Sequence, residues 1–215
     1  MRQRKVKNEA AKLAAVEEFM VKGAMAYRGK WRSVFSCEND AAPLFVEIGC
    51  GRGHFLAAHA LANPQNLYLG IEGRSSIVLR ALELIRDEEL TNMLCIPDYI
   101  EDIGHYFADG EIDGIYLNFS DPWPKIRHAK RRLTHKRYLE GYRRALKPGG
   151  CIEIKTDNEG FFRFTLDQCH VLGMDVVDIS YDLHNSNLPS RLITTQYEHR
   201  FRLLNKKILY CMVKV

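Results

Sequence analysis

Short apolar runs alternate with amphipathic segments along the chain from Leu44 onward. The apolar runs have the length and the β-branched or aromatic character of buried strands. They are LFVEIG, LYLGIE, NMLCI, EIDGIYLNFS, CIEIKTD and the residues near 175–181 and 207–215. Helical periodicity between them predicts helices at about 53–62, 75–89, 134–146 and 161–171. This alternation predicts an α/β fold with a doubly wound, mostly parallel, seven-stranded sheet and helices on both faces.

The chain before the first expected strand has a different pattern. From about Asn8 to Arg32 an apolar stripe predicts a helix, although two glycines weaken its second half. Basic residues precede it, and we expect them to form a flexible arm that orders on binding. These residues are Arg2, Arg4, Lys5 and Lys7. We assign the basic arm and helix, residues 1–42, to the same domain as residues 43–215.

The charge of the chain is concentrated in one segment. A length of 215 residues with 46% hydrophobic residues is sufficient for one globular domain. The formal net charge is +4, but Lys125 to Arg137 contains seven Lys or Arg and no acid, so the remainder sums to about −3 (+4 less +7). A local basic patch indicates a nucleic-acid partner, because phosphate contacts supply much of the affinity in such complexes.

The cysteines and histidines give no indication of a metal site. The six cysteines include no CxxC pair, and the eight histidines show no ligand spacing, so we assign no metal and expect a reducing, cytoplasmic setting. The N-terminus lacks the apolar segment of a secretory signal, and no run is long enough to cross a bilayer. We therefore expect no membrane insertion.

A glycine-rich segment follows the first expected strand, in the order Glu47-Ile48-Gly49-Cys50-Gly51-Arg52-Gly53. Loops that bind a dinucleotide use GxGxxG and bring a helix N-terminus to a pyrophosphate. The spacing here is GxGxG and an acid precedes it, which suits a cationic ligand better. The second expected strand ends at Glu72, where this type of fold binds ribose hydroxyls. The alternative is a glycine turn that merely joins a strand to a helix.

A second candidate site follows the fourth expected strand, which ends in NFSDPWP, residues 118–124. Its two prolines fix the backbone and make a rigid ledge that carries Asp121. Ligands of doubly wound sheets bind at the carboxyl ends of the strands, so this ledge is expected beside the glycine segment. The basic run begins directly after it. A carboxylate beside a cationic segment indicates chemistry on a polyanion.

The basic run also has a plain interpretation as a solvated surface. If the run is helical, however, Arg127 with Arg131 and Lys130 with Thr134 fall on one face, and we therefore favour phosphate binding. The polar connection from residue 183 to residue 202 is longer than most loops, which makes it a further candidate functional segment.

Glu47, the three glycines and Glu72 resemble the S-adenosylmethionine site of Rossmann-like methyltransferases. NFSDPWPKIRHAKRRLT, together with EIGCGRG, GIE and TDN, resembles the bacterial tRNA (guanine-N7)-methyltransferases over nearly the whole chain. The resemblance implies a single Rossmann-like methyltransferase domain, S-adenosylmethionine as cofactor and tRNA as partner. It further implies methylation of N7 of a guanosine in the tRNA variable loop.

The resemblance also implies roles for individual residues. The expected cofactor-binding residues are Glu47, Gly49, Gly51, Gly53, Glu72, Asp98 and Asp121. The expected substrate-binding residues are Lys125, Asp157, Thr195, Gln196, Tyr197 and Glu198. The expected RNA-binding residues are Arg127, His128, Lys130, Arg131 and Arg132. Asp121 is the expected catalytic residue, and Asp98 is expected to hold the adenine, although a turn-forming aspartate after a proline is an equal alternative.

The chemistry of guanine limits what Asp121 can do. Guanine N7 carries no proton, so its attack on a sulfonium methyl needs no general base. We expect Asp121 to orient the guanine or to stabilise the positive charge that develops on it, while Asp157 and Glu198 share the Watson–Crick edge. For Asp157 a helix N-cap is an equal alternative, and the two roles could divide between Asp157 and Asn158.

Three other functions remain open at this point. They are a methyltransferase acting on another RNA or on a protein, a non-catalytic RNA-binding module, and a nicotinamide dehydrogenase. The GxGxG spacing and the lack of a hydride-transfer His or Tyr disfavour the dehydrogenase. Whether the active form is a monomer or a homodimer is also open.

Overall fold

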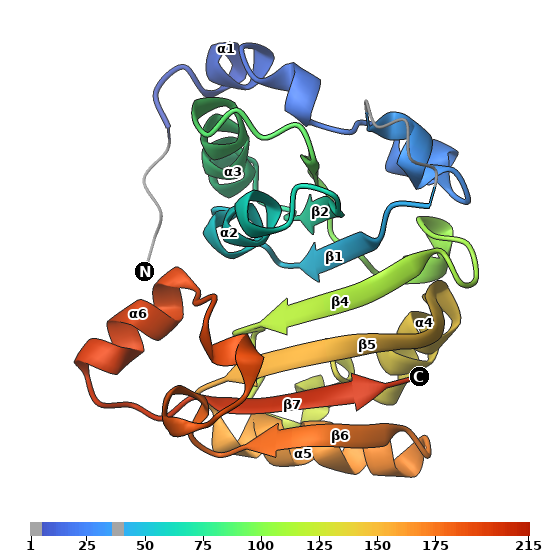
Figure 1. Ribbon diagram of the computed structural model, residues 1–215, viewed down its shortest axis with the longest axis vertical. Helices are drawn as coiled ribbons and strands as arrows, with labels where there is room; N and C mark the ends of the chain where they lie inside the picture. The colour runs from blue at the N-terminus through green and yellow to red at the C-terminus, as the bar shows by residue number, and fades with distance from the viewer. Residues whose placement is uncertain (1–5, 36–40) are drawn as a thin grey trace.

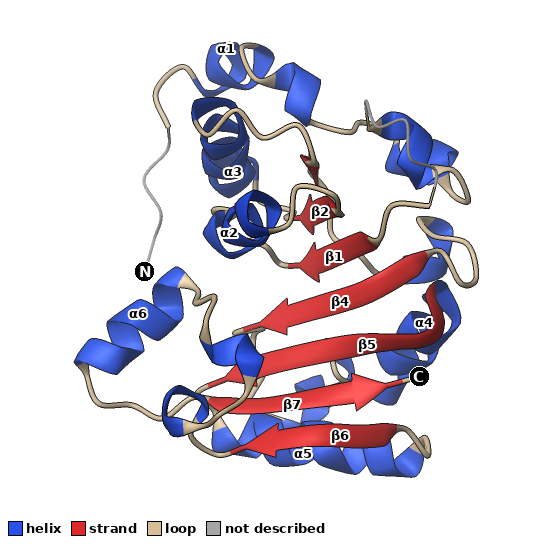
Figure 2. Ribbon diagram, in the orientation of Figure 1, coloured by secondary structure: helices blue, strands red, loops and turns tan. Residues whose placement is uncertain are grey.

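The computed structural model describes residues 6–35 and 41–215, which form a seven-stranded sheet with helices on both faces (Figures 1 and 2). The strand order is β3-β2-β1-β4-β5-β7-β6, and only β7 runs antiparallel to its neighbours among the described strands. The strands are β1 Leu44–Ile48, β2 Leu67–Ile71, β3 Met93–Ile96, β4 Ile112–Asn118, β5 Leu146–Thr156, β6 Asp175–Ser180 and β7 Leu209–Lys214. The predicted fold class is confirmed.

The four helices predicted between the strands form as α2, α3, α4 and α5. The α-helices of the described residues are α1 Glu9–Ala14, α2 His54–Ala62, α3 Ser75–Asp87, α4 Lys136–Ala145, α5 Glu159–Val171 and α6 Gln196–Leu203. Strand order reverses at β1, which lies between β2 and β4, so the carboxyl ends of these strands border the crevice where ligands of this architecture bind. In Figure 1 the arrows of β1, β4 and β5 point to the same edge, and α6 stands beyond it.

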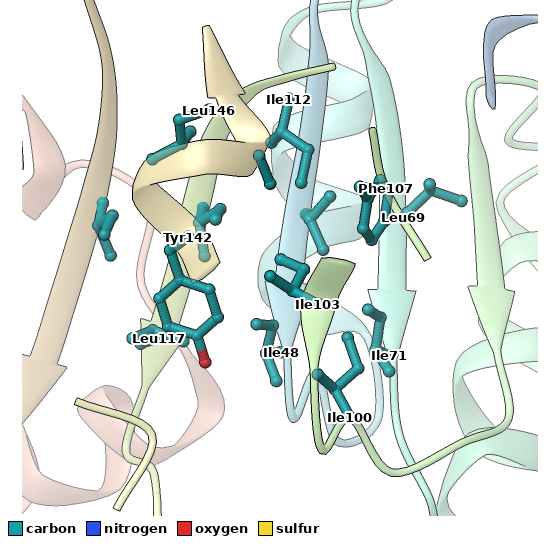
Figure 3. Packing of buried hydrophobic residues seen from close by; sticks show 14 of the residues in the cluster. Ile48, Leu69, Ile71, Ile100, Ile103, Phe107, Ile112, Leu117, Tyr142 and Leu146 are labelled. Atoms are coloured by element: carbon teal, nitrogen blue, oxygen red, sulfur yellow. The ribbon is translucent and has the colours of Figure 1, made fainter. Parts of the chain in front are cut away.

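Alternating side chains of the strands supply two hydrophobic cores. On one face Val46, Leu69 and Leu117 pack with side chains of α4 and α5, and Figure 3 shows Ile48, Ile71, Ile103 and Tyr142 among them. On the other face Tyr68 and Tyr116 pack with α2 and α3. Burial of apolar surface on both faces, at roughly 25 cal/mol per Å², holds the strand ends in fixed register.

The helix expected from Asn8 to Arg32 is wrong in its second part. Only α1 is a regular helix, and three short 3₁₀ helices follow at Glu17–Phe19, Ala24–Tyr27 and Trp31–Val34. Gly23 and Gly29 adopt φ values of 63° and 79°, which an α-helix cannot contain. Trp31 is fully buried, and its backbone N–H donates to Glu111. The basic residues Arg2, Arg4 and Lys5 lie outside the described residues.

Two other expectations need correction. The strand expected as CIEIKTD, from Cys151, begins earlier: β5 starts at Leu146 and includes Lys147-Pro148-Gly149-Gly150, and the helix expected to about residue 146 ends at Ala145. The polar connection before β7 contains α6 as well as two 3₁₀ helices, at Leu183–Asn185 and Pro189–Arg191. In the described part of the chain, no helix has both the length and the apolar character that crossing a bilayer requires.

Candidate active site

The cofactor end of the site begins with the backbone of the glycine segment. Gly49, Gly51 and Gly53 have φ values of 79°, 59° and 78°, so each occupies the left-handed region that other residues rarely adopt. Gly49 N–H donates to the carbonyl of Ile71, which ties the loop to the end of β2. Backbone geometry therefore opens the turn between β1 and α2.

Glu47 lies at the end of β1 and is only 2% exposed. Its Oε1 accepts a hydrogen bond of 2.8 Å from Asn118 Nδ2 on β4. Three buried polar atoms near these strand ends have no hydrogen-bond partner among the described residues: Glu47 Oε2, Asn118 Oδ1 and Ser120 Oγ. Because buried polar groups are almost always satisfied, their grouping indicates a polar ligand at this edge.

Burial also changes the acidity of Glu47. Loss of solvent raises the pKa of its carboxyl from 4.5 to about 7, against the opposing effects of the Asn118 hydrogen bond and the positive charge of Lys155. A cation placed beside Oε2 favours the ionised form, so Glu47 is suited to hold an ammonium group.

Two further acids follow β2 and β3. Glu72 Oε1 accepts a hydrogen bond from Arg74 N–H, and Asp98 Oδ2 accepts one of 2.6 Å from the Tyr106 hydroxyl. Tyr99, which received no role of its own from the sequence, is 64% exposed, and its ring lies against the backbone of Gly73. A Cβ at Gly73 would fall 2.4 Å from that ring. The Tyr directly after Asp98 was the available signal for this flat apolar surface.

The ledge after β4 is strained as well as rigid. Phe119 and Trp123 have φ values of 50° and 40°, which are rare for bulky residues and occur mainly at functional sites. Arg132 donates to the carbonyl oxygens of Pro122 and Trp123, at 2.9 and 3.0 Å, and so clamps the ledge. Asp121 is exposed, and no described residue forms a hydrogen bond or ion pair with its carboxylate.

The basic run forms a 3₁₀ helix, η5 (Ile126–Arg131), rather than an α-helix. Residues three apart are eclipsed in a 3₁₀ helix, so the expected pairing of Arg127 with Arg131 on one face is wrong. The pairing of Lys130 with Thr134 is also wrong, because Thr134 is fully buried and its hydroxyl contacts Thr165.

The cations of the run divide into two groups. Lys125, Arg127 and Lys130 are exposed. Arg131 is also exposed and lies over the Trp123 ring at 4.9 Å, while the His128 ring packs edge-on against the same ring. Arg132 instead faces inward, with its guanidinium 4.3 Å from the centre of the Phe164 ring. Arg132 therefore supports the ledge, whereas its neighbours face solvent.

The expected substrate run lies at the start of α6. Thr195 Oγ1 accepts from Glu198 N–H, and Glu198 Oε2 accepts from Thr195 N–H, which is a capping box. Both residues are buried. Gln196 and Tyr197 are exposed: Gln196 Nε2 lies 3.0 Å from His54 Nε2, and the Tyr197 ring stacks on Phe119 at 5.7 Å. The N-terminus of α6 thus contacts both the first residue of α2 and the ledge.

Asp157 lies just beyond the end of β5. The helix-capping role falls to Asn158, whose Oδ1 accepts from Phe161 N–H at 2.8 Å. Asp157 is left facing solvent, with only a long ion pair of 3.8 Å to Lys206. The capping alternative for Asp157 is therefore wrong, and its carboxylate is accessible at the same edge, where substrate contact stays a prediction.

The cavity at the start of β5 does not coincide with the predicted site. It has a volume of about 440 Å³ and is lined by Lys147, Met174 and Val215 among others, none of which is a predicted site residue. Asp121, Asp157 and Tyr197, near the carboxyl ends of the strands, are exposed. Within the described residues, no three His, Cys, Asp or Glu side chains are grouped as a metal site requires.

The arrangement of strands, glycine turn and strand-end acids defines a class, the Rossmann-like S-adenosylmethionine-dependent methyltransferases. Solved structures with this fold include an antibiotic-related methyltransferase, with 13% identity, a TM-score of 0.58 and coverage of 99% of this chain and 96% of that one. A SAM-dependent methyltransferase from Aquifex aeolicus has 13% identity, a TM-score of 0.55 and coverage of 80% and 82%. At such identities the likeness concerns the fold alone.

The sequence comparisons are more specific. A family model described as "Putative methyltransferase" matches residues 41–211. A tRNA (guanine-N(7)-)-methyltransferase from Geobacillus sp. (strain WCH70) is 40% identical over 203 residues, which cover 94% of this chain and 90% of the relative. The chain belongs to the tRNA (guanine-N7)-methyltransferase family.

Proposed function

We propose that this protein transfers the methyl group of S-adenosylmethionine to N7 of a guanosine in the variable loop of tRNA, giving N7-methylguanosine. Family membership supports the reaction class. The observation that carries the proposal is the unpartnered Asp121 carboxylate, held on a strained ledge between an acid-lined glycine turn and an exposed basic segment. A tRNA substrate would place the reaction in the cytoplasm.

The residues at the cofactor end fit S-adenosylmethionine. The cofactor supplies an electrophilic methyl group on a sulfonium, and it carries an ammonium, a ribose diol and an adenine. Glu47 Oε2, buried and without a described partner, would hold the ammonium. Glu72, at the end of β2, would accept from the ribose hydroxyls, while Asp98 and the Tyr99 ring would border the adenine. S-adenosylmethionine carries no phosphate, which agrees with the presence of an acid, Glu47, directly before the glycine turn.

Asp121 would act on the guanine rather than on a proton. Its carboxylate can accept hydrogen bonds from guanine N1–H and N2–H₂, or lie near the positive charge that develops as N7 is methylated. The clamp by Arg132 keeps the ledge in place, so the base would be held in line with the methyl group without reorganisation. Alignment of this kind accounts for several kcal/mol of a barrier, on the order of 7–11 kcal/mol at most.

The exposure of the expected substrate-binding residues indicates which of them can contact the guanine directly. Asp157 and Tyr197 are exposed at the carboxyl edge, whereas Glu198 is fully buried in the capping box. We therefore assign the direct base contacts to Asp157 and Tyr197, and a supporting role to Thr195 and Glu198. Lys125, Arg127, Lys130 and Arg131 would contact phosphates, which position the tRNA by its backbone and shape.

The test is to incubate the protein with an unmodified tRNA transcript and S-adenosylmethionine carrying a labelled methyl group, and then to map the labelled nucleotide. We expect one N7-methylguanosine in the variable loop. Label in another tRNA nucleotide, in ribosomal RNA only, or in protein would overturn the proposed substrate. Absence of transfer together with absence of cofactor binding would indicate a non-catalytic RNA-binding module instead.

A further inference from the structure

A lysine is fully buried beneath the segment that leads into α6. Lys155 is the penultimate residue of β5, in the apolar run CIEIKTD, and it is 1% exposed. Its register partner on β4 is Asn118, the residue that donates to Glu47. Glu47 is the register partner of Tyr116, two residues before Asn118 on β4. Glu47, Asn118 and Lys155 therefore lie on the same face of three adjacent strands, near their carboxyl ends.

The ammonium of Lys155 is fully engaged with one segment of the chain. Nζ donates to the carbonyl oxygens of Ser190 and Ile193, at 2.8 and 3.0 Å. It also lies 3.4 Å from both carboxylate oxygens of Glu198, which is itself fully buried. The Phe55 ring of α2 lies 5.0 Å away on the remaining side. A lysine with three partners in residues 190–198 joins this segment to the sheet.

Glu198 transmits this attachment to the start of α6. The Glu198 carboxylate contacts Lys155 and also accepts a hydrogen bond from Thr195 N–H in the capping box. Between Thr195 and Glu198 lie Gln196, which contacts His54 of α2, and Tyr197, which stacks on Phe119 of the ledge. The position of these two side chains relative to the site therefore depends on the ion pair beneath them.

We propose that Lys155 is a positioning residue for methyl transfer: through Glu198 it sets the N-terminus of α6 against the start of α2 and the ledge. The inference rests on the proposed function, because it assumes that Tyr197 faces the bound base. Lys155 does not touch the reacting atoms. A buried ion pair is a poor source of fold stability compared with apolar residues, and its placement under the site agrees better with a role in defining one geometry.

Other charged groups near Lys155 do not replace its partners. Burial lowers the pKa of Lys155, while Glu198, Glu153 and Glu47 raise it. The Glu153 carboxylate is hydrogen-bonded to Ser190 Oγ and to the Tyr210 hydroxyl. Glu198 is thus the acid that shares hydrogen bonds with both Lys155 and the helix start.

The experiment compares five proteins: wild type, Lys155→Met, Glu198→Gln, the double variant Lys155→Met/Glu198→Gln, and the control Lys147→Met. Lys147 lies at the other end of β5 and pairs with Asp113 at 2.9 Å, away from the site. Glutamine is accepted at the third position of a capping box, so Glu198→Gln removes the charge and keeps the cap. Readouts are amide hydrogen exchange of residues 190–203, S-adenosylmethionine binding, and kcat and KM for tRNA.

Lys155→Met should lower kcat by about 100-fold, because small displacements of positioned groups have effects of this size. Exchange in residues 190–203 should rise, while S-adenosylmethionine affinity changes less than about threefold and Lys147→Met changes neither kcat nor this exchange. The double variant should recover about tenfold in kcat, since it no longer buries an unpaired carboxylate.

Three results would overturn the proposal. The first is unchanged amide hydrogen exchange in α6 of Lys155→Met. The second is a loss of S-adenosylmethionine affinity as large as the loss of kcat with tRNA. The third is simple additivity of the effects of Lys155→Met and Glu198→Gln on kcat. If wild type methylated no tRNA guanosine, the proposed function would fail. The exchange and cofactor-binding measurements would then still decide whether Lys155 positions α6.

Discussion

The two halves of the sheet hold their site residues by different means. On the β1–β3 side, the turn after β1 is shaped by three glycines with positive φ and by backbone hydrogen bonds to Ile71. On the β4–β7 side, side chains hold the site residues in place: Arg132 donates hydrogen bonds to the ledge, and Lys155 donates to the segment that leads into α6. The half that we propose to bind the cofactor, here called the cofactor half, is thus defined by main-chain geometry. The half that we propose to bind the substrate, the substrate half, is defined by polar side chains. Substitutions should separate these two modes.

The largest effect is expected at Asp121, which lies on the ledge at the end of β4. Asp121→Asn should lower the single-turnover rate by about 100- to 1000-fold with both ligands saturating, because a preorganised negative group near developing positive charge is lost. Unfolding free energy should not change, since the side chain is exposed.

The matched control for Asp121 is Asp167→Asn, an exposed aspartate on α5 outside the site. Rapid-quench measurement of methylated tRNA gives the rate, and urea denaturation gives the stability. A near wild-type rate for Asp121→Asn would show that the carboxylate neither orients the base nor stabilises its charge.

The second prediction separates Arg132 from its neighbour Arg131. Arg132→Met removes two hydrogen bonds to the ledge, so unfolding free energy should fall by about 1–3 kcal/mol and kcat by up to about 100-fold. Arg131→Met should keep kcat, raise KM for tRNA and reduce the slope of log affinity against log salt by about 1. If both variants changed only the salt slope, Arg132 would be an ordinary phosphate contact.

This contrast also shows what the sequence could and could not reveal. The strand pattern and the Glu47–Gly53 turn were predictable because local spacing determines them. The role of Arg132 was not, since its partners depend on how the ledge folds back. The spacing of Thr195 and Glu198, Thr-x-x-Glu, is typical of a capping box and predicts the start of α6, whereas the family resemblance implied substrate contact for both residues. Lys155, a charge inside an apolar strand, was a signal that went unused.

The third prediction concerns pH and returns to the cofactor half. The folded-state pKa of Glu47 is raised from 4.5 to about 7, so its contribution to the stability of the ligand-free protein is present below pH 4.5 and is lost as pH rises through about 7. A cationic ligand favours the ionised form. S-adenosylmethionine affinity should therefore rise by up to about tenfold per pH unit between about pH 5.5 and 7, where the ligand's own amino group stays protonated.

Calorimetry in two buffers with different ionisation enthalpies would measure the proton released from Glu47 on binding. Glu47→Gln should bind more weakly at pH 7 and lose the pH dependence. His59 does not account for the effect, because burial lowers the pKa of its ring to about 4. A pH dependence that survives in Glu47→Gln would assign the released proton to another group.

The smallest effect tests whether the cofactor half depends on backbone shape alone. Gly53 and Gly23 have φ values of 78° and 63°, so alanine at either position should cost about 1–2 kcal/mol of unfolding free energy. Only at Gly53 would the added Cβ meet a neighbour, with Ala81 Cβ at 3.0 Å, and this crowding should add about 1 kcal/mol. Gly53→Ala should therefore also weaken S-adenosylmethionine binding several-fold, because the crowded turn shifts away from the ligand, whereas Gly23→Ala should leave binding unchanged. Urea denaturation and calorimetry on the two variants decide the point: equal binding in both would mean that side chains, not the turn, define the cofactor half as well.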